Sequence, residues 1–175
     1  FHGRGVEKNL TKALEHFKIS ADNGDRFSQY FVGHLCSQGV DVDCGPPTAF
    51  TYFKLSADKG FDASQYEVSL LYDSGTGVKQ NPAAALQYLQ KSADQEYNPA
   101  LTTLGYKYDH GYGVKQDYEK AFRYTKIAAD NGYAQAQFNL GTLYSSGKGA
   151  ELDLINLKFA LAMISEFLLA RIKIT

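Results

Sequence analysis

The sequence predicts an all-α fold, an α-solenoid of antiparallel helix pairs with a 36-residue period. Turn glycines recur with that spacing and without a slip, at Gly3, Gly39, Gly75, Gly111 and Gly147. A column of small residues keeps the same step, at Ala21, Ala57, Ala93 and Ala129. A helical pattern flanks the turns on both sides, as in the segment 118–129 that follows Gly111. A fixed period between about 20 and 50 residues is the sequence signature of a solenoid or repeat array.

The glycine column divides the chain into repeats, which we treat as one domain over residues 1–150. The predicted organisation is a partial repeat at 1–24, whole repeats at 25–60, 61–96 and 97–132, a partial repeat at 133–150, and a divergent C-terminal helix at 151–175. Phe1 falls inside a repeat turn and no Met precedes it, so we expect the sequence to be a fragment of a longer protein.

The second helix of each repeat has recognisable start and stop signals. Asn9 is a candidate N-cap, because its side chain can accept hydrogen bonds from the first free backbone N–H groups. The cap column continues as Gly45, Asn81, Asp117 and Asp153. Pro46 and Pro82 occupy the first helical position, where the missing N–H costs nothing. In the partial repeat 1–24 this second helix is expected to end near Asn23, where Gly24 can adopt the left-handed backbone that ends a helix.

The first helix of each repeat is predicted from a 3–4 spacing of apolar residues, as in Arg26–Gln38 with Val32, Leu35 and Cys36. A column of small residues is expected where helices approach closely: Gly33, Ser69, Gly105 and Gly141. A large apolar column is expected to fill the core: Leu14, Phe50, Leu86 and Phe122. Two departures stand out, Asp41 in the turn and Glu96 in place of a closing glycine.

After Ala150 the register fails, and the segment from Leu154 to Ile172 is apolar nearly all round. A terminal repeat is atypical because it caps the stack, so we predict a capping helix. The alternatives are a contact with an absent segment or partner, a membrane segment, and an artefact of gene-model translation. Lys158 and Glu166 interrupt the run and leave it shorter than the roughly 20 apolar residues of a spanning helix.

The residues in these columns resemble the Sel-one-like repeat (SLR, or HCP-like) family, a relative of the tetratricopeptide repeats. The resemblance covers about residues 1–150 and is carried by Val114, Lys120, Ala121, Tyr124, Ala128, Ala129, Gly132, Ala136, Leu140, Gly141, Tyr144, Gly147 and Gly149. It implies a right-handed α/α superhelix that serves as a scaffold for protein complexes.

The same resemblance implies a concave face lined by the first helix of each repeat. Projecting that face onto this sequence gives Phe27, Tyr30, His34, Tyr66, Leu70, Asp73, Tyr106, Asp109, His110, Phe138 and Thr142. The candidate partner-binding groove is Tyr30, His34, Tyr66, Leu70, Tyr106, Asp109 and His110. As alternatives, the column of Tyr30, Tyr66 and Phe138 packs between helices, and Tyr106, Asp109 and His110 are ordinary solvated surface.

Composition excludes several classes of function. The net charge is −1, which does not suit a nucleic-acid binder with its basic surface. Aromatic residues make up 14% of the chain, so disorder is not expected. No secretory signal pattern is found within these residues. Two cysteines, Cys36 and Cys44, are interpreted as free thiols, with a local disulfide as the alternative. The compartment stays open, with the cytoplasm favoured.

We find no motif for a catalytic, cofactor or metal site. The Gly-x-Gly pairs join helix to helix, and no strand, third glycine or phosphate-binding Lys-Ser/Thr accompanies them. The four histidines are scattered, without the spacing of zinc ligands. Neither cysteine adjoins a histidine, and there is no Gly-x-Ser-x-Gly elbow.

The sequence therefore predicts a non-catalytic scaffold or adaptor that binds a protein or peptide partner through the concave face, with no cofactor. Neither a nucleic acid nor a membrane is an expected partner, and the oligomeric state stays open. One alternative is a regulatory repeat segment of a larger protein in a kinase-linked, endoplasmic-reticulum-degradation or cell-wall-synthesis context. Another is a ligand-binding or hydrolytic member of the SLR family.

Overall fold

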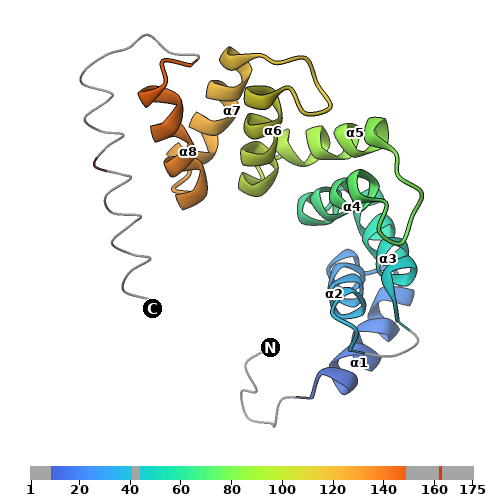
Figure 1. Ribbon diagram of the computed structural model, residues 1–175. Coiled ribbons are helices and arrows are strands. Elements are labelled where there is room, and N and C mark those ends of the chain that lie inside the picture. The colour runs from blue at the N-terminus through green and yellow to red at the C-terminus, as the bar shows by residue number, and fades with distance from the viewer. Residues whose placement is uncertain (1–8, 41–43, 149–161, 163–175) are drawn as a thin grey trace. The chain divides into compact units, whose positions relative to one another are not determined.

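The computed structural model describes residues 9–40, 44–148 and 162 (Figure 1). All regular structure in the stretches 9–40 and 44–148 is α-helical, as predicted, and Figure 1 shows helices alternating with short turns. The helices are α1 (Leu10–Asp22), α2 (Arg26–Ser37), α3 (Pro46–Asp58), α4 (Asp62–Ser74), α5 (Pro82–Ala93), α6 (Asn98–His110), α7 (Tyr118–Asp130) and α8 (Ala134–Ser145). The expected features at Gly3, Asp41 and 151–175 lie outside the described residues, apart from Ala162.

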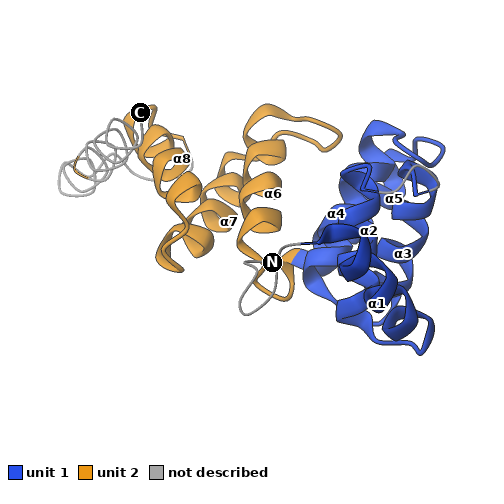
Figure 2. Cartoon of the chain, turned by 90° about the horizontal axis from the view of Figure 1, so that it is seen from below, with its two compact units in different colours: residues 1–92 blue, residues 93–175 orange. Residues whose placement is uncertain are grey.

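The predicted 36-residue period is confirmed in the helix starts. The helices that open a repeat, here called A helices, begin at Arg26, Asp62, Asn98 and Ala134. The B helices begin at Leu10, Pro46, Pro82 and Tyr118. The chain is an all-α repeat solenoid that divides into two compact units, residues 1–92 and 93–175 (Figure 2).

The predicted caps set the starts of the B helices. The Oδ1 atoms of Asn9, Asn81 and Asp117 accept from the backbone N–H groups of Lys12, Ala84 and Lys120 at 2.9, 3.1 and 2.9 Å. These bonds satisfy donors that have no partner within the helix. The bond to the Lys120 N–H also lowers the pKa of the Asp117 carboxyl.

The closing position of each B helix needs a left-handed backbone. Gly24, Gly60 and Gly132 have φ of 93°, 80° and 80°, respectively. Glu96 stands in the same column with φ 59°, and it is the one non-glycine residue with positive φ among the described residues. A side chain in that region meets its own backbone, which costs about 1–2 kcal/mol. The departure noted at Glu96 therefore leaves the left-handed turn in place but strains it.

Hydrogen bonds between residues 30 positions apart join the two helices of a repeat in the first unit and, at Tyr88, one repeat to the next. The Ser56 hydroxyl donates to the carbonyl oxygen of Arg26 at 2.7 Å, and the Ser92 hydroxyl to that of Asp62 at 2.8 Å. Tyr88 donates to Asp58 at 3.0 Å in the same spacing. Because these polar groups pair across the interface, the helices can bury them without the penalty of an unsatisfied group.

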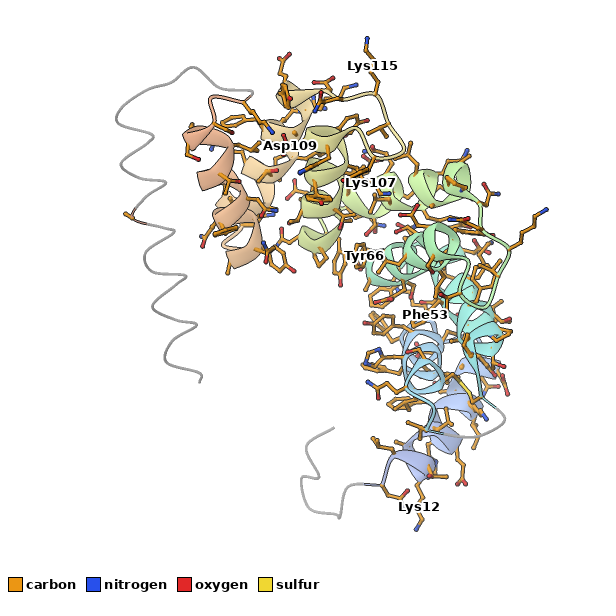
Figure 3. The ribbon with its side chains drawn as sticks, viewed as in Figure 1. Lys12, Phe53, Tyr66, Lys107, Asp109 and Lys115 are labelled. Carbon is orange, nitrogen blue, oxygen red and sulfur yellow. A yellow bond between two sulfur atoms is a disulfide. The ribbon has the colours of Figure 1, made fainter. Side chains whose placement is uncertain are left out.

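The close-approach column is confirmed at Gly33 and Gly105. Phe53 is buried between α2 and α3 (Figure 3), and a Cβ atom built on Gly33 would lie 2.8 Å from its ring. A Cβ on Gly105 would overlap the Thr125 hydroxyl. The expected large core column is only partly confirmed. Leu14 is buried, but Phe50, Leu86 and Phe122 are half-buried, because they lie at the edge of the helix contact and not at its centre.

The prediction of two free thiols is wrong. Cys36, near the end of α2, and Cys44, just before α3, form a disulfide with a Cα–Cα distance of 4.7 Å. Both residues are 1% exposed. Their Cα–Cα distance lies in the range that a disulfide requires, which the sequence spacing alone did not establish.

Candidate functional site

The candidate groove residues all lie on A helices, and they fall in both units. Tyr30 and His34 are on α2, and Tyr66 and Leu70 on α4, all in the first unit. Tyr106, Asp109 and His110 are on α6, in the second unit. Figure 3 labels Tyr66 and Asp109 on these helices. We describe the two sets separately.

In the first unit, Tyr30 takes part in packing. Its ring lies 5.2 Å from that of Phe61 and 5.8 Å from that of Phe53, between centroids, and it is half-buried. Burial raises the pKa of the Tyr30 hydroxyl, and Glu67 and Asp62 add to the rise. His34 stacks on Tyr30 at 6.1 Å, and Leu70 is 38% exposed. The packing alternative therefore describes Tyr30 well.

Sequence reasoning missed Glu67, a half-buried acid on α4 near His34 and Tyr30. Burial raises the pKa of its carboxyl, and the nearby His34 opposes the rise. The signal was available, since Phe31 precedes Glu67 and Thr103 follows it in the 36-residue register. An ionisable residue in a column of otherwise uncharged side chains indicates a position that packing alone does not explain.

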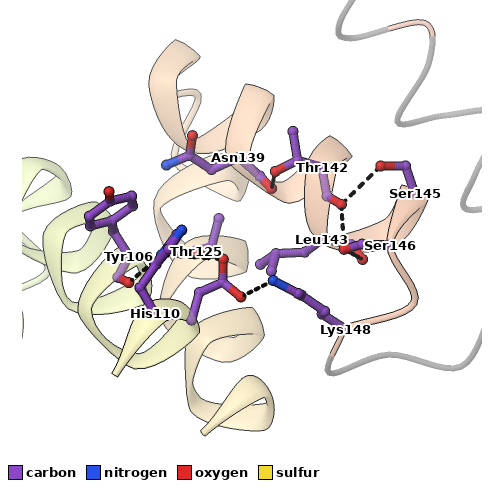
Figure 4. A pocket seen from close by; sticks show the side chains of 11 residues that line it. Tyr106, His110, Thr125, Asn139, Thr142, Leu143, Ser145, Ser146 and Lys148 are labelled. Atoms are coloured by element: carbon purple, nitrogen blue, oxygen red, sulfur yellow. Dashed lines mark hydrogen bonds and ion pairs between the residues drawn. The ribbon is translucent and has the colours of Figure 1, made fainter. Parts of the chain in front are cut away.

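In the second unit, α6, α7 and α8 enclose a pocket of about 430 Å³ (Figure 4). Its walls include three residues from the predicted face of α6 and one from α8, namely Tyr106, Asp109, His110 and Thr142. The structure thus brings together the part of the candidate groove that lies in this unit. The pocket is also lined by Gly105, Thr125, Asn139, Leu143, Ser145, Ser146 and Lys148.

One ion pair joins two repeats across this pocket. The Lys148 ammonium donates to Oδ1 of Asp109 at 2.9 Å (Figure 4), and the Asp109 side chain is 15% exposed. The hydrogen bond to Asp109 raises the pKa of Lys148. The same ammonium lies 5.0 Å from the ring centroid of Tyr118. Lys148 follows α8 in the turn and is separated from Asp109 by 39 positions, so the sequence offered no sign of this pairing.

Three rings form a cluster beside the ion pair. The His110 ring lies 4.2 Å from that of Tyr106 and 5.5 Å from that of Tyr112, between centroids. The planes of His110 and Tyr112 are parallel to within 1°. Tyr106 is 49% exposed and Tyr112 is 55% exposed. Tyr106 and His110 of this cluster line the pocket, and Tyr112 packs against them.

The pocket supports binding by hydrogen bonds, ring stacking and charge pairing. In the part of the chain covered by 9–40 and 44–148, no three His, Cys, Asp or Glu side chains are grouped as a metal ion would require. None of the helices in the same part is long and apolar enough to span a bilayer.

Comparison with known proteins gives one family and several similar structures. The model of the Sel1 repeat matches residues 1–25, 26–61, 62–97, 99–133 and 134–156. No curated protein matches the chain.

Among solved structures, a Sel1 repeat protein from Oxalobacter formigenes is 25% identical with a TM-score of 0.82, covering 93% of this chain and 67% of its own. A protective antigen of uropathogenic Escherichia coli, described as displaying an SLR fold, is 27% identical with a TM-score of 0.80. That match covers 91% of this chain but only 33% of the antigen. A Pseudomonas aeruginosa protein with 20% identity and a TM-score of 0.64 shares the fold; the match covers 93% of this chain and 61% of that one.

Proposed function

Because this chain belongs to the Sel1 repeat family, whose members usually mediate protein–protein interaction, we propose that it is a non-catalytic scaffold binding a protein or peptide partner. Each unit carries a candidate contact surface of its own. In the first unit it is the face of the A helices with Tyr30, His34, Tyr66 and Leu70, and in the second it is the α6–α8 pocket.

The observation that carries this proposal is the pocket of about 430 Å³ with its exposed ring cluster. Tyr106 and Tyr112 are rigid, amphipathic side chains, and tyrosine is among the residues that most often dominate binding energy at interfaces. The Asp109–Lys148 pair adds charge at a defined place beside the rings. Such a surface provides both contact area and orientation for a peptide segment.

Affinity capture with quantitative mass spectrometry tests the proposal. The bait variant Tyr106→Ala/His110→Ala removes two rings of the cluster. We expect it to lose a partner that the wild type retains, because a truncated hot-spot residue costs at least about 2 kcal/mol of binding, or roughly 30-fold in Kd.

The matched control is Lys126→Ala/Asp130→Ala, which removes an exposed ion pair on α7 in the same unit. This control should recover the partner at the wild-type level. Equal recovery by all three baits would refute the assignment of the α6 face as the contact surface.

A further inference from the structure

We propose that the α6–α8 pocket binds the guanidinium group of an arginine side chain on the partner. This inference rests on the proposed function and specifies its ligand chemistry. Three features of the pocket support it: hydroxyl groups that can only accept, an acidic group already holding a cation, and the exposed ring of Tyr106 in its lining.

The hydroxyl groups of α8 face the pocket as hydrogen-bond acceptors. The Thr142 hydroxyl donates its proton to the carbonyl of Asn139 at 2.6 Å, and the Ser145 hydroxyl to that of Thr142 at 2.9 Å. Ser146 donates to the Thr142 carbonyl at 2.8 Å (Figure 4). A hydroxyl has one proton, so these three oxygens have only lone pairs left for a ligand. They favour a ligand rich in N–H groups.

Thr125 supplies a hydroxyl deep in the pocket. It lines the pocket from α7, and the residue is 2% exposed. Thr125 lies beside Gly105, where the absence of a Cβ leaves the hydroxyl its space. A ligand N–H that reaches this depth would meet a hydroxyl oxygen that can accept it.

His110 contributes a further acceptor. Its Nδ1 lies 3.0 Å from the carbonyl oxygen of Tyr106, so this nitrogen carries a proton and donates it. In the neutral ring Nε2 then has the free lone pair. The donors that line the pocket are the Asn139 amide N–H₂, the remaining N–H bonds of Lys148 and the hydroxyls of Tyr106 and Thr125, which can also accept. The balance of polar groups therefore favours a donor ligand over an anion, which would meet the carboxylate of Asp109.

The site already holds a cation, which the chain itself provides. The Lys148 ammonium lies 2.9 Å from the Asp109 carboxylate and 5.0 Å from the Tyr118 ring centroid. A guanidinium group can pair with a carboxylate through two parallel N–H bonds and can stack on aromatic rings, and an ammonium can do neither as well. The exposed ring of Tyr106, which lines the pocket, offers that stacking surface. Arginine would therefore compete with Lys148 for Asp109.

The competition gives a test, because loss of the Lys148 charge should raise the affinity for a cationic ligand and lower it for an anionic one. The probe is Nα-acetyl-arginine amide, titrated to about 20 mM into the full ¹⁵N-labelled chain and followed by NMR, a range that detects millimolar affinity. We expect shifts in the amide signals of Gly105–His110 and Ser145–Lys148. The Lys148→Gln variant should bind the probe about two- to fivefold more tightly, because it frees Asp109 from an ion pair of modest strength. Asp109→Asn should bind it about fivefold or more weakly.

An uncharged probe and a pair of control variants complete the design. Nα-acetyl-citrulline amide has the shape of the arginine probe without its charge and should bind about tenfold more weakly. Lys126→Gln and Asp130→Asn make the same charge changes at the exposed pair on α7 and should leave the affinity unchanged. Circular dichroism confirms that each variant is folded before its titration.

Three results would overturn the proposal: no shift with the arginine probe, equal affinity for citrulline, or weaker probe binding by Lys148→Gln. Binding of Nα-acetyl-glutamate amide that is lost in Lys148→Gln would assign the pocket to anions instead. If the probe fails while partner capture still depends on Tyr106 and His110, the guanidinium assignment falls and the scaffold function stands. If capture is also independent of those rings, both fall.

Discussion

The ring of Phe53 occupies the space that any side chain at position 33 would need, since a Cβ on Gly33 would lie 2.8 Å from its Cδ1 atom. Phe53 is 2% exposed and comes from the B helix α3, while Gly33 comes from the A helix α2. In the next copies of the register, Ser69 stands opposite Leu89 and Gly105 opposite Thr125. At Gly33 and Gly105 the missing side chain of the A helix leaves space for a side chain of the B helix.

Gly33→Ala should destabilise the chain. Overpacking a core costs about 1–3 kcal/mol, and the higher helix propensity of Ala returns at most about 1 kcal/mol. We expect a net loss of about 1–2 kcal/mol in the free energy of unfolding, measured by urea denaturation. Phe53→Leu in the same background should recover part of that loss by making room. A double variant no more stable than Gly33→Ala alone would show that the Phe53 ring is not the obstacle.

Glu96→Gly should stabilise the chain, because it relieves the strain of a side chain at φ 59°. The left-handed backbone costs about 1–2 kcal/mol, and the extra freedom of glycine in the unfolded state offsets part of the gain. We expect a net increase of about 0.5–1 kcal/mol in the free energy of unfolding.

The reverse substitution tests the same column. Gly132 has φ 80°, and a Cβ there would meet nothing within 4 Å, so Gly132→Ala probes the backbone alone. It should cost about 1 kcal/mol in thermal or urea unfolding. If Glu96→Gly lowered stability, contacts of the Glu96 side chain would outweigh its backbone strain.

Reduction of the Cys36–Cys44 disulfide should lower stability. The bond closes a loop between residues eight positions apart, and the loss of that constraint on the unfolded chain corresponds to about 2–3 kcal/mol. Urea denaturation with and without reductant measures the difference. The Cys36→Ala/Cys44→Ala variant is the control, and its free energy of unfolding should be the same with and without reductant. Thiol titration of the native, oxidised protein should find no free thiol.

The disulfide also bears on location. Disulfides persist in oxidising compartments and are rare in the cytosol. We therefore propose an oxidising compartment in place of the cytoplasm favoured from sequence. Alkylation of the two cysteines in intact cells, before any oxidation during purification, would contradict this proposal.

Glu67→Gln should raise stability at neutral pH and have no effect in acid. Burial raises the pKa of this carboxyl above its ordinary value, so its ionised form is disfavoured in the folded state. Below the unfolded-state pKa both states are protonated and no penalty exists. The penalty develops as the pH rises through the folded-state pKa, and it is complete above that value.

Urea melts at pH 3.5, 5 and 7 test the sign of this effect. The exposed acid Glu15 on α1, changed to Gln, is the control for removing a carboxylate in the same unit. A Glu67→Gln variant that loses stability at pH 7 would mean that its carboxylate is stabilised there, for example by His34.

Much of the fold was predictable because its information is local and periodic. Asn9 caps α1, Pro46 opens α3 and Gly24 closes a turn with neighbours a few residues away, so their roles could be read directly. The packing of Phe122 was overestimated, since the register gives its column but not its distance from the centre of the contact. Phe53, three positions after Phe50, faces that centre instead.

The candidate site was predictable only where it follows the register. Tyr106, Asp109, His110 and Thr142 were expected on one face and do line one pocket. Lys148 was not expected, because its column holds Val40, Thr76 and Tyr112 in the preceding copies. Its pairing with Asp109 joins residues 39 positions apart. That separation differs from the 36-residue period, so the repeat pattern does not predict the pair.

The hydrogen bonds from Ser56 to Arg26 and from Ser92 to Asp62 each reach back by the same 30 positions. Such a chain can therefore change its length only in whole modules. Removing 36 residues between equivalent points would let each serine meet a new but equivalent carbonyl. Removing 35 or 37 would shift the register across the junction by one residue, which is about 100° of turn within a helix, and a buried hydroxyl at that junction would face the wrong group.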